Sequence, residues 1–445
     1  MPPKNIIRLH RFLSYPEHGR PMQDNPIELT KTAAGIPVIT ERVPNSASAG
    51  FLVAVRTGSR DEYEGIYGLS HLLEHTVFRE TKTRNSFEMA KEMEGAGGEL
   101  NAFTAKEMTG YYGITLAETS EVAMKLVGDI VANPLINEKD TELEKEIVLQ
   151  ELSMVKSEPE TYIHDLFEEN LWAGNELGRD EGGTEETVKP LTHRDLRKYY
   201  DERYGRPNLA VFATGDIDPA RVAEWAEETF NPMEAPVVNR RTAPSMPGAK
   251  YTCTDHNSEH INIGFGFPVG RLEAKERITA KVLGAVMGAG TSSRLFQNVR
   301  EKNALVYAIY SNGHNYSDAG YISAAMSCTT KNVIKALQET ARSYSEFRRN
   351  GLEKGELERT KNLLKGAVAR GAETTDNRIY RMCVGYMTHG SASSTAETLA
   401  MIDSVTEDEV MAAAEKYLRA DALNISVLGR CGKKIQEFDA SSLEI

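Results

Sequence analysis

The chain has 445 residues, with 52 Lys and Arg against 65 Asp and Glu, so its net charge is 52 − 65 = −13 at pH 7. At about 100–200 residues per domain, this length predicts two to four domains. The composition, 40% hydrophobic and 26% charged, is typical of globular proteins rather than of disordered, collagen-like or disulfide-rich chains. The acid excess weighs against nucleic-acid binding. Apolar runs are all shorter than the ~18–20 residues that span a bilayer, so we expect no membrane span.

The cysteines and the N-terminal segment bear on where the protein works. The four cysteines are far apart and form no C-x-x-C pair, which favours a reducing compartment over a disulfide framework or a cysteine zinc site. They are Cys253, Cys328, Cys383 and Cys431. Residues 1–26 are predicted to be an extension, without the long apolar core and cleavage site of a secretory signal. We expect a cytoplasmic protein, with an organellar matrix as the alternative.

The first half of the chain alternates strand-like and helix-like segments. Runs of β-branched and aromatic residues bounded by turn residues predict strands, and apolar residues at helical spacing predict helices. The predicted strands cover 35–43, 48–58, 99–104, 109–116 and 208–218. The predicted helices cover 68–80, 86–94, 122–132, 138–156, 161–171 and 192–204. We interpret residues 27–231 as one lobe.

The second half begins after residues 232–250, which are rich in Pro, Met and Arg and are predicted to be a linker. Strands are then predicted at 260–267, 306–311, 320–328 and 423–428. Helices are predicted at 274–287, 333–349 and 356–369. We interpret residues 251–432 as a second lobe and residues 433–445 as a C-terminal tail.

The two halves resemble each other. Their closing strands, at Leu209 and Leu423, align with an offset of 423 − 209 = 214. Aligning Ser70 with Ser293 gives 293 − 70 = 223 and places Arg294 opposite His71. These offsets predict a duplicated unit of about 200 residues. We therefore expect an α+β fold of two homologous lobes, each a mainly antiparallel sheet with helices packed on it, facing each other across a cleft.

The most informative stretch is GLSHLLEHTVF, in which His71 and His75 are four residues apart. On a helix that turns about 100° per residue, these side chains are separated by about 40° and share one face. Two neutral imidazoles at this spacing can bind one zinc ion. Glu74 lies next to the same face and can reach a metal-bound water as a general base. The alternative is a chance match, with both histidines as ordinary core or surface residues.

A catalytic zinc needs a third protein ligand, and a carboxylate from another helix is a common choice. Within the predicted helix 138–156, the stretch ELEKEIVLQELSMV offers four glutamates. Of these, Glu144 and Glu151 are seven residues, or about two turns, apart and can face the histidine helix together. The alternative is that these charges form a solvated helix face. The four glutamates are Glu142, Glu144, Glu146 and Glu151.

Together these residues resemble the inverted zinc-binding motif of the pitrilysin/insulinase metallopeptidases, the inverzincins. Gly58 and Gly68 stand upstream of the motif as in that family's signature, and Glu151 follows at a similar separation, 151 − 75 = 76. The resemblance includes GGELNAFTAKEMTGYY and covers roughly residues 27–430. It implies a zinc metalloendopeptidase.

The resemblance implies a role for each residue of the motif. One Zn²⁺ per chain would be held by His71, His75 and Glu151, and Glu74 would be the general base. Glu144 would orient one of the histidines through a hydrogen bond. The alternative for Glu144 is a solvated helix residue.

The resemblance also points to residues that would bind the substrate. Arg300 and Tyr307 are similar to the family's distal Arg and Tyr pair, which would stabilise the oxyanion; the alternative is a surface Arg and a packed Tyr. The strand ELNAFTA resembles the edge strand to which an extended peptide adds; alternatively, its Asn simply caps a turn. The residues that would offer main-chain groups are Asn101, Ala102, Phe103 and Thr104.

The resemblance to the short members of the family implies a chamber built from two chains. Because the chain carries both the metal motif and the Arg/Tyr pair, we expect a homodimer, with a heterodimer with a motif-lacking homologue as the alternative. The expected substrates are unfolded peptides. The competing hypotheses are a non-hydrolytic scaffold and a peptide-binding subunit that cleaves only within a hetero-oligomer.

Overall fold

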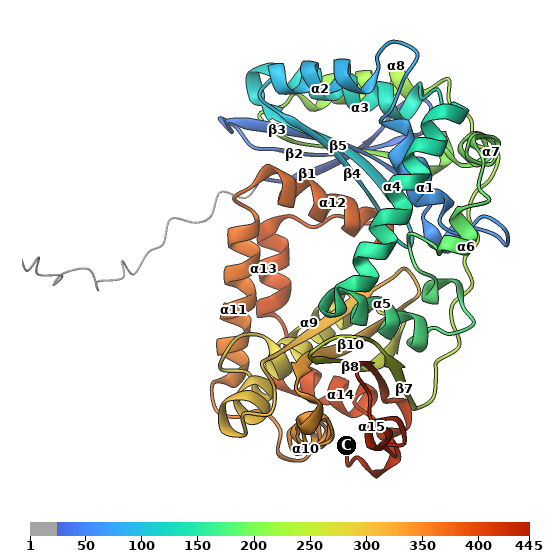
Figure 1. The fold of residues 1–445 in the computed structure, drawn as a ribbon. Helices are drawn as coiled ribbons and strands as arrows, with labels where there is room; N and C mark the ends of the chain where they lie inside the picture. Colours follow the sequence, from blue (N-terminus) through green and yellow to red (C-terminus); the bar gives the residue numbers. More distant parts are fainter. Residues whose placement is uncertain (1–24) are drawn as a thin grey trace, which may run out of the picture.

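The computed structural model describes residues 25–445, so most of the predicted N-terminal extension lies outside the described residues. Figure 1 shows two lobes, one from the N-terminal half in blue to green and one from the C-terminal half in yellow to red. Each lobe contains one β-sheet with helices packed on it. The predicted two-lobed α+β fold is confirmed.

The first lobe contains a six-stranded sheet of order β1-β2-β6-β3-β5-β4. All neighbours are antiparallel except β2 and β6. Its strands are β1 (Ile27–Lys31), β2 (Pro37–Arg42), β3 (Ser48–Val55), β4 (Glu99–Thr104), β5 (Thr109–Leu116) and β6 (Leu209–Gly215). The helices of this half are α1 (Leu69–Val77), α2 (Ser86–Gly95), α3 (Ser120–Ala132), α4 (Glu138–Ser157), α5 (Pro159–Leu171), α6 (Glu185–Val188), α7 (His193–Arg203) and α8 (Pro219–Phe230).

The second lobe contains a five-stranded sheet of order β7-β11-β8-β10-β9. Its strands are β7 (Lys250–Asp255), β8 (Ile261–Gly270), β9 (Ala308–Asn315), β10 (Ala319–Cys328) and β11 (Asn424–Gly429). The α-helices are α9 (Ala274–Gly288), α10 (Val333–Asn350), α11 (Glu356–Gly371), α12 (Thr375–His389), α13 (Thr395–Asp403), α14 (Glu407–Tyr417) and α15 (Lys433–Gln436). A π-helical segment, η5 (Phe296–Lys302), precedes β9.

The strand order of the second sheet repeats that of the first once β1 is set aside. The starts of β2 and β7 differ by 250 − 37 = 213, and those of α3 and α10 by 333 − 120 = 213. Helix α9 contacts β9, α11 and α14, just as α1 contacts β4, α4 and α7. Helix α9 is therefore the counterpart of α1. The alignment that set Arg294 opposite His71 is wrong, because Arg294 follows α9 and pairs with Glu356 of α11 at 2.6 Å.

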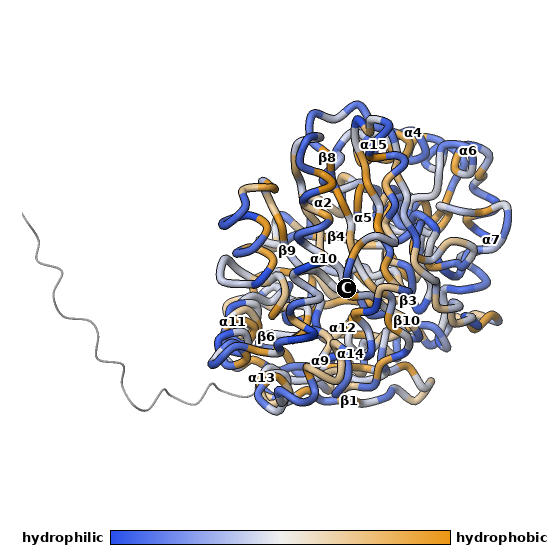
Figure 2. Tube along the Cα trace, turned by 90° about the horizontal axis from the view of Figure 1, so that it is seen from below, coloured by the Kyte–Doolittle hydropathy of each residue, from blue (hydrophilic) through white to orange (hydrophobic). Residues whose placement is uncertain are grey.

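Both faces of each sheet are covered, which explains strands that are apolar throughout rather than alternating. β3 is buried from its second residue to its end. On one face α3 and α8 contact the sheet, and Phe51 lies edge to face against Trp225, with ring centroids 6.3 Å apart. Figure 2 shows hydrophobic segments along the inner strands and hydrophilic segments along the outer loops.

The opposite face of each sheet is covered by a helix from the other half of the chain. Helix α12 contacts β3 and β6, where Ile379 and Met382 pack with Leu52 and Phe212. Helix α5 reciprocally contacts β8 and β11, and Phe167 packs against Tyr321 of β10. The two lobes therefore exchange helices, and neither sheet is fully buried without the other lobe (Figure 1).

A buried ionic cluster also joins the lobes. Arg60 of the first lobe donates to both carboxylate oxygens of Asp318, in the turn between β9 and β10, at 2.8 and 2.9 Å. The same guanidinium donates to Glu107 at 2.6 Å. Arg241, from the segment between the lobes, pairs with Asp61 at 2.7 Å.

The cysteines differ from the prediction. Cys253 and Cys431 form a disulfide across a sequence separation of 178 residues. The spacing of the cysteines did not indicate this bond, because the two residues meet only when β7 pairs in parallel with β11. Cys328 and Cys383 are free and buried. Within the described residues, no helix is both long and apolar enough to cross a membrane.

Candidate metal centre

Helix α1 starts at a sharply turned glycine. Gly68 has φ of +87°, and a Cβ there would lie 2.5 Å from the carbonyl oxygen of Gly182, so this position requires glycine. The buried Glu62 carboxylate accepts from the N–H groups of Gly68 and Ser70 at 2.8 and 2.6 Å. This caps the first turn, since a helix begins with unpaired N–H groups. The start of α1, and with it the orientation of the histidines, is therefore fixed.

The predicted metal ligands converge. His71 and His75 lie on one face of α1, and Glu151 reaches them from α4, which packs against α1. Glu151 Oε2 is 3.3 Å from His75 Nε2 and 3.9 Å from His71 Nε2. One ligand atom from each residue lies within 4.8 Å of the other two, and among residues 25–445 this is the one group of three that could hold a metal ion.

Of the four candidate glutamates of α4, Glu144 takes a distinct position. Its Oε2 lies 3.1 Å from His75 Nδ1, and its Oε1 lies 3.4 Å from Arg79. Burial lowers the pKa of His75, but the hydrogen bond with Glu144 and the charges of Glu151 and Glu74 outweigh burial and raise it overall. Because Glu144 occupies Nδ1, Nε2 is the nitrogen of His75 left for a metal.

The predicted general base, Glu74, is held by β4, the predicted substrate strand. Glu74 Oε2 accepts a hydrogen bond from Thr104 Oγ1, at the end of β4, at 2.8 Å. Burial raises the pKa of Glu74, against the opposing effects of Thr104 and His75. A carboxylate with a raised pKa is a better proton acceptor at neutral pH.

The residues present fit a zinc ion. Two imidazole nitrogens and one carboxylate oxygen are the ligand set of catalytic zinc sites, which keep a further position open. Burial, and then the neighbouring His75, lower the pKa of His71 to about 4, so its lone pair is free at neutral pH. The buried Nδ1 of His71 has no hydrogen-bond partner among the described atoms.

Arg300 and Tyr307 make other contacts in this structure. Arg300 stacks on Phe296 of its own η5 segment, 4.6 Å from the ring centroid. Tyr307 is 77% exposed just before β9. Neither forms a hydrogen bond or ion pair with the cluster within the described part of the chain. Their predicted role in binding the substrate stays a prediction.

The predicted substrate strand is β4, which pairs with β5 alone and forms one edge of the first sheet. Its outer main-chain groups therefore face away from the sheet, as β-addition requires. Asn101 Oδ1 accepts from the N–H of Ala102 at 2.8 Å, a local bond that does not extend to a turn. Phe103 packs edge to face against Tyr380 of α12, with centroids 5.2 Å apart.

Other residues near the centre were not found from the sequence. The one sequence signal for the capping role of Glu62 is its position as an acidic residue shortly before the start of a predicted helix. A group of carboxylates surrounds Lys106, which follows Thr104 by two residues. The Nζ of Lys106 lies 3.7 Å from Glu168 and 3.9 Å from Glu181. Burial raises the pKa of Glu181 to about 7. These residues come from separate segments, so no spacing pattern could reveal the group.

Comparison with known proteins shows the family of the chain. Residues 37–185 match the family described as Insulinase (Peptidase family M16), and residues 190–364 match Peptidase M16 inactive domain. A protein of Mycobacterium tuberculosis named "uncharacterized zinc protease" is 32% identical over 410 residues, which are 91% of this chain and 93% of that protein. The chain belongs to the insulinase family of M16 peptidases.

Solved structures share the fold over nearly the whole chain. A protease from Helicobacter pylori matches with a TM-score of 0.84 at 18% identity, covering 91% of this chain and 99% of that chain. A chain of complex III2 from Candida albicans matches with a TM-score of 0.82 at 19% identity, covering 93% and 98%. At these identities the likeness shows the fold alone.

Proposed function

We propose that the protein is a zinc-dependent endopeptidase that hydrolyses unfolded peptides. The observation that carries the proposal is the convergence of His71, His75 and Glu151, with the Glu74 carboxylate held beside them by Thr104. The name of the M. tuberculosis relative supports the same class of activity. We propose one zinc ion per chain.

The chain's own residues account for the chemistry around the ion. The two histidines and Glu151 would hold the zinc ion, which would supply Lewis acidity and make a proton of water easier to remove near neutral pH. Glu74 accepts that proton as the water attacks the peptide carbonyl and then returns it to the leaving amine. The hydrogen bond from Thr104 fixes the carboxylate of Glu74 for both transfers.

The substrate would lie along β4. An extended peptide would add to the free edge, hydrogen-bonding the main chain of Asn101, Ala102, Phe103 and Thr104. Arg300 and Tyr307 would contact the substrate from the second lobe and stabilise the negative charge on the carbonyl oxygen.

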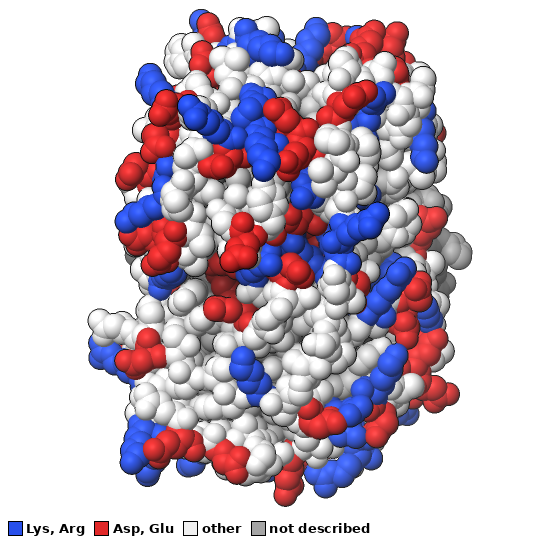
Figure 3. All heavy atoms as spheres, turned by 90° about the vertical axis from the view of Figure 1, so that its right-hand side faces the viewer, with Lys and Arg blue, Asp and Glu red and all other residues white. Residues whose placement is uncertain are grey.

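Two chains would form the working chamber, as a homodimer or as a heterodimer with a homologue lacking the motif. On the face that Figure 3 shows, Lys and Arg are mixed with Asp and Glu. This face therefore does not favour general nucleic-acid binding. A closed chamber would exclude folded proteins and admit unfolded peptides.

The test is hydrolysis of a quenched-fluorescent peptide library by the purified chain, beside Glu74→Gln. The Gln side chain retains an oxygen for Thr104, so the variant should keep its zinc but lose at least ~100-fold in turnover, the range of general-base effects. The matched control is Glu146→Gln, an exposed glutamate of α4. We expect it to cleave like the wild type.

Equal cleavage by wild type and Glu74→Gln would contradict the proposal. Stoichiometric zinc without any cleavage would contradict self-sufficient activity and favour a subunit that needs a partner chain or serves as a scaffold. The fold shared with a chain of the Candida complex is compatible with such a scaffold.

A further inference from the structure

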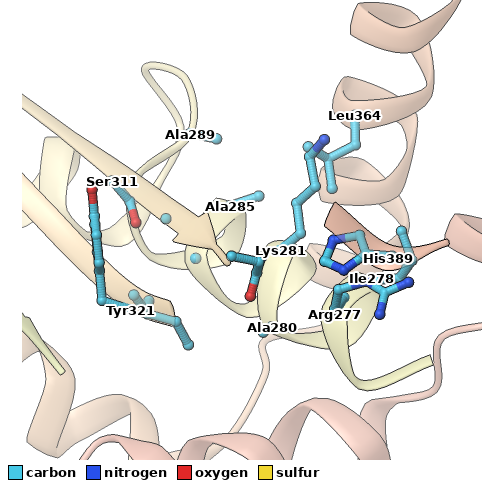
Figure 4. A pocket seen from close by; sticks show the side chains of 14 residues that line it. Arg277, Ile278, Ala280, Lys281, Ala285, Ala289, Ser311, Tyr321, Leu364 and His389 are labelled. Carbon is cyan, nitrogen blue, oxygen red and sulfur yellow. The ribbon is translucent and has the colours of Figure 1, made fainter. Parts of the chain in front are cut away.

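The second lobe contains a cavity of about 370 Å³ between α9, the β9–β10 hairpin and α11. His389, at the end of α12, closes one side of it (Figure 4). Because α9 and α11 are the counterparts of α1 and α4, this cavity corresponds in position to the metal centre of the first lobe. The second lobe therefore has a cavity at the place where the first lobe has the three candidate ligands.

The side chains that line the cavity differ in charge from the rest of the protein. Arg277 and Lys281 are one helical turn apart on the same face of α9, and Figure 4 shows the His389 ring beside Arg277. None of the described residues lining the cavity is Asp or Glu, although the chain has an excess of acidic residues. Ile278 and Leu364 supply an apolar wall.

The basic groups form no ion pair with a described carboxylate. Burial lowers the pKa of the Arg277 guanidinium, and the charge of Glu273 does not outweigh it. Arg277 donates to the carbonyl oxygen of Leu272 at 2.9 Å and forms no ion pair with a described residue. Lys281 and His389 form no hydrogen bond or ion pair within residues 25–445. Burial, followed by Arg277, lowers the pKa of His389 to about 4. The neutral ring can donate or accept a hydrogen bond beside the two cations.

The cavity borders the first lobe. Tyr321, one of its lining residues, donates to Glu168 of α5 at 2.7 Å. Helix α5 directly follows α4, which carries Glu151. The charge of Glu107, three residues after Thr104, acts on His389. A peptide anchored in the cavity could thus extend toward the metal centre.

We propose that this cavity binds a carboxylate of the peptide substrate, through Arg277 and Lys281, with His389 as a neutral hydrogen-bonding partner. The inference rests on the proposed peptidase function and adds a substrate anchor to it. The Arg guanidinium can form paired hydrogen bonds to a carboxylate. The apolar wall suits the aliphatic part of the peptide residue that carries this carboxylate. The volume is within the range of small-ligand sites.

The test measures peptide binding, without turnover, to Glu74→Gln protein. Fluorescent unfolded peptides of increasing length are prepared with a free C-terminal carboxylate, with a C-terminal amide, and with an amide but a terminal Glu side chain. We expect the free acid, the side-chain acid or both to bind at least about tenfold more tightly than the plain amide, in the longer peptides. The acidic peptide that gains affinity identifies the source of the carboxylate.

Removal of the cations should abolish this difference. In the Glu74→Gln background, Arg277→Gln with Lys281→Gln should bind acids and amides alike, and Lys281→Gln alone should lose part of the preference. Lys281 is exposed and its side chain forms no hydrogen bond or ion pair with a described residue, so the single variant tests the site even if the double variant misfolds. The control is Lys331→Gln with Lys335→Gln, two exposed lysines outside the cavity.

Three outcomes would overturn the inference: equal binding of acids and amides by the parent protein, a preference that survives in the double variant, or one that the control abolishes equally. Failure of the peptidase proposal looks different. In that case the wild-type protein would hydrolyse no peptide, while the Glu74→Gln variant would still bind acidic peptides more tightly than amides. The carboxylate site would then be supported and the peptidase function would not.

Discussion

At the scale of single residues, His75 lies between two carboxylates that approach different nitrogens of its ring. Glu144 is at Nδ1 and Glu151 is near Nε2, at 3.1 and 3.3 Å. Both glutamates belong to α4 and are seven residues apart, so the helix presents them to the same ring from positions about two turns apart. We propose that Glu144 orients the imidazole and that Glu151 completes the ligand set.

The first prediction concerns Glu144. Glu144→Gln should weaken zinc binding by about 10- to 100-fold, since partners that orient a metal-bound histidine contribute this much to affinity. Competition with a chromogenic chelator measures the change. Glu146→Gln, on the exposed side of the same helix, should bind zinc like the wild type. An unchanged affinity in Glu144→Gln would show that the bond to His75 does not support the metal.

The second prediction concerns the pH dependence of stability through Glu62. Burial raises the pKa of this carboxyl from 4.5 to about 8. Between these values the folded protein holds a proton that the unfolded chain has released. The stabilisation from this group is therefore complete below pH 4.5 and is lost as the pH rises through 8.

Glu62→Gln cannot titrate, so its free energy of unfolding should fall less than that of the wild type between pH 5 and pH 8. Denaturant unfolding at several pH values measures the slope of the free energy of unfolding against pH for each protein. The contributions of the other titrating groups cancel when the two slopes are compared. Parallel slopes would show that Glu62 is ionised in the folded protein.

At the scale of helices and strands, periodicity predicted most elements of both sheets, including β4, β5 and α4, close to their observed bounds. It missed α12, in which Thr, Arg and Tyr interrupt the apolar residues that contact the other lobe. An element stabilised by a sheet distant in the sequence carries a weak local signal, because its contacts and not its propensity decide its structure.

The same reasoning applies to the candidate site. The spacing of His71, Glu74 and His75 is local and was readable from the sequence. The choice of Glu151 over the other glutamates of α4 needed either a family resemblance or the docking of α4 on α1. Residues of α9, β9, β10, α11 and α12 line the cationic cavity, so no local sequence pattern could predict it.

The third prediction tests the exchanged helices. Phe167→Ala should lower the free energy of unfolding by about 3–5 kcal/mol, the usual cost of truncating a buried aromatic side chain. The residue is buried on α5 against the second sheet. Phe87→Ala is the control, because Phe87 is 74% exposed and should change stability by less than ~0.5 kcal/mol. Equal effects would mean that the packing of α5 on the second lobe adds little.

At the scale of the whole molecule, the lobes are joined in three ways: by the segment between them, by the exchanged helices α5 and α12, and by the ionic cluster around Arg60. The guanidinium of Arg60 is fully buried, so its carboxylate partners must balance its charge. The position of the second lobe, and with it of Arg300, Tyr307 and the cationic cavity, depends on these contacts.

The fourth prediction follows for Asp318. Asp318→Asn removes one of the two carboxylates facing Arg60 and should cost about 3 kcal/mol, as expected when one partner of a buried pair is lost. Chemical unfolding measures the loss. Zinc affinity should stay unchanged, because the ligands all lie in the first lobe. A variant as stable as the wild type would show that Glu107 alone balances the buried charge.

The central claim, a hydrolytic zinc centre built from His71, His75, Glu151 and Glu74, is tested most directly by restoring zinc to the metal-free protein. Metal is removed with a chelator, zinc is added back stepwise, and peptide hydrolysis is followed. The account predicts no hydrolysis without metal and full recovery at one zinc per chain, with no recovery in His71→Ala. Undiminished hydrolysis by the metal-free protein, or zinc binding that restores none, would contradict it.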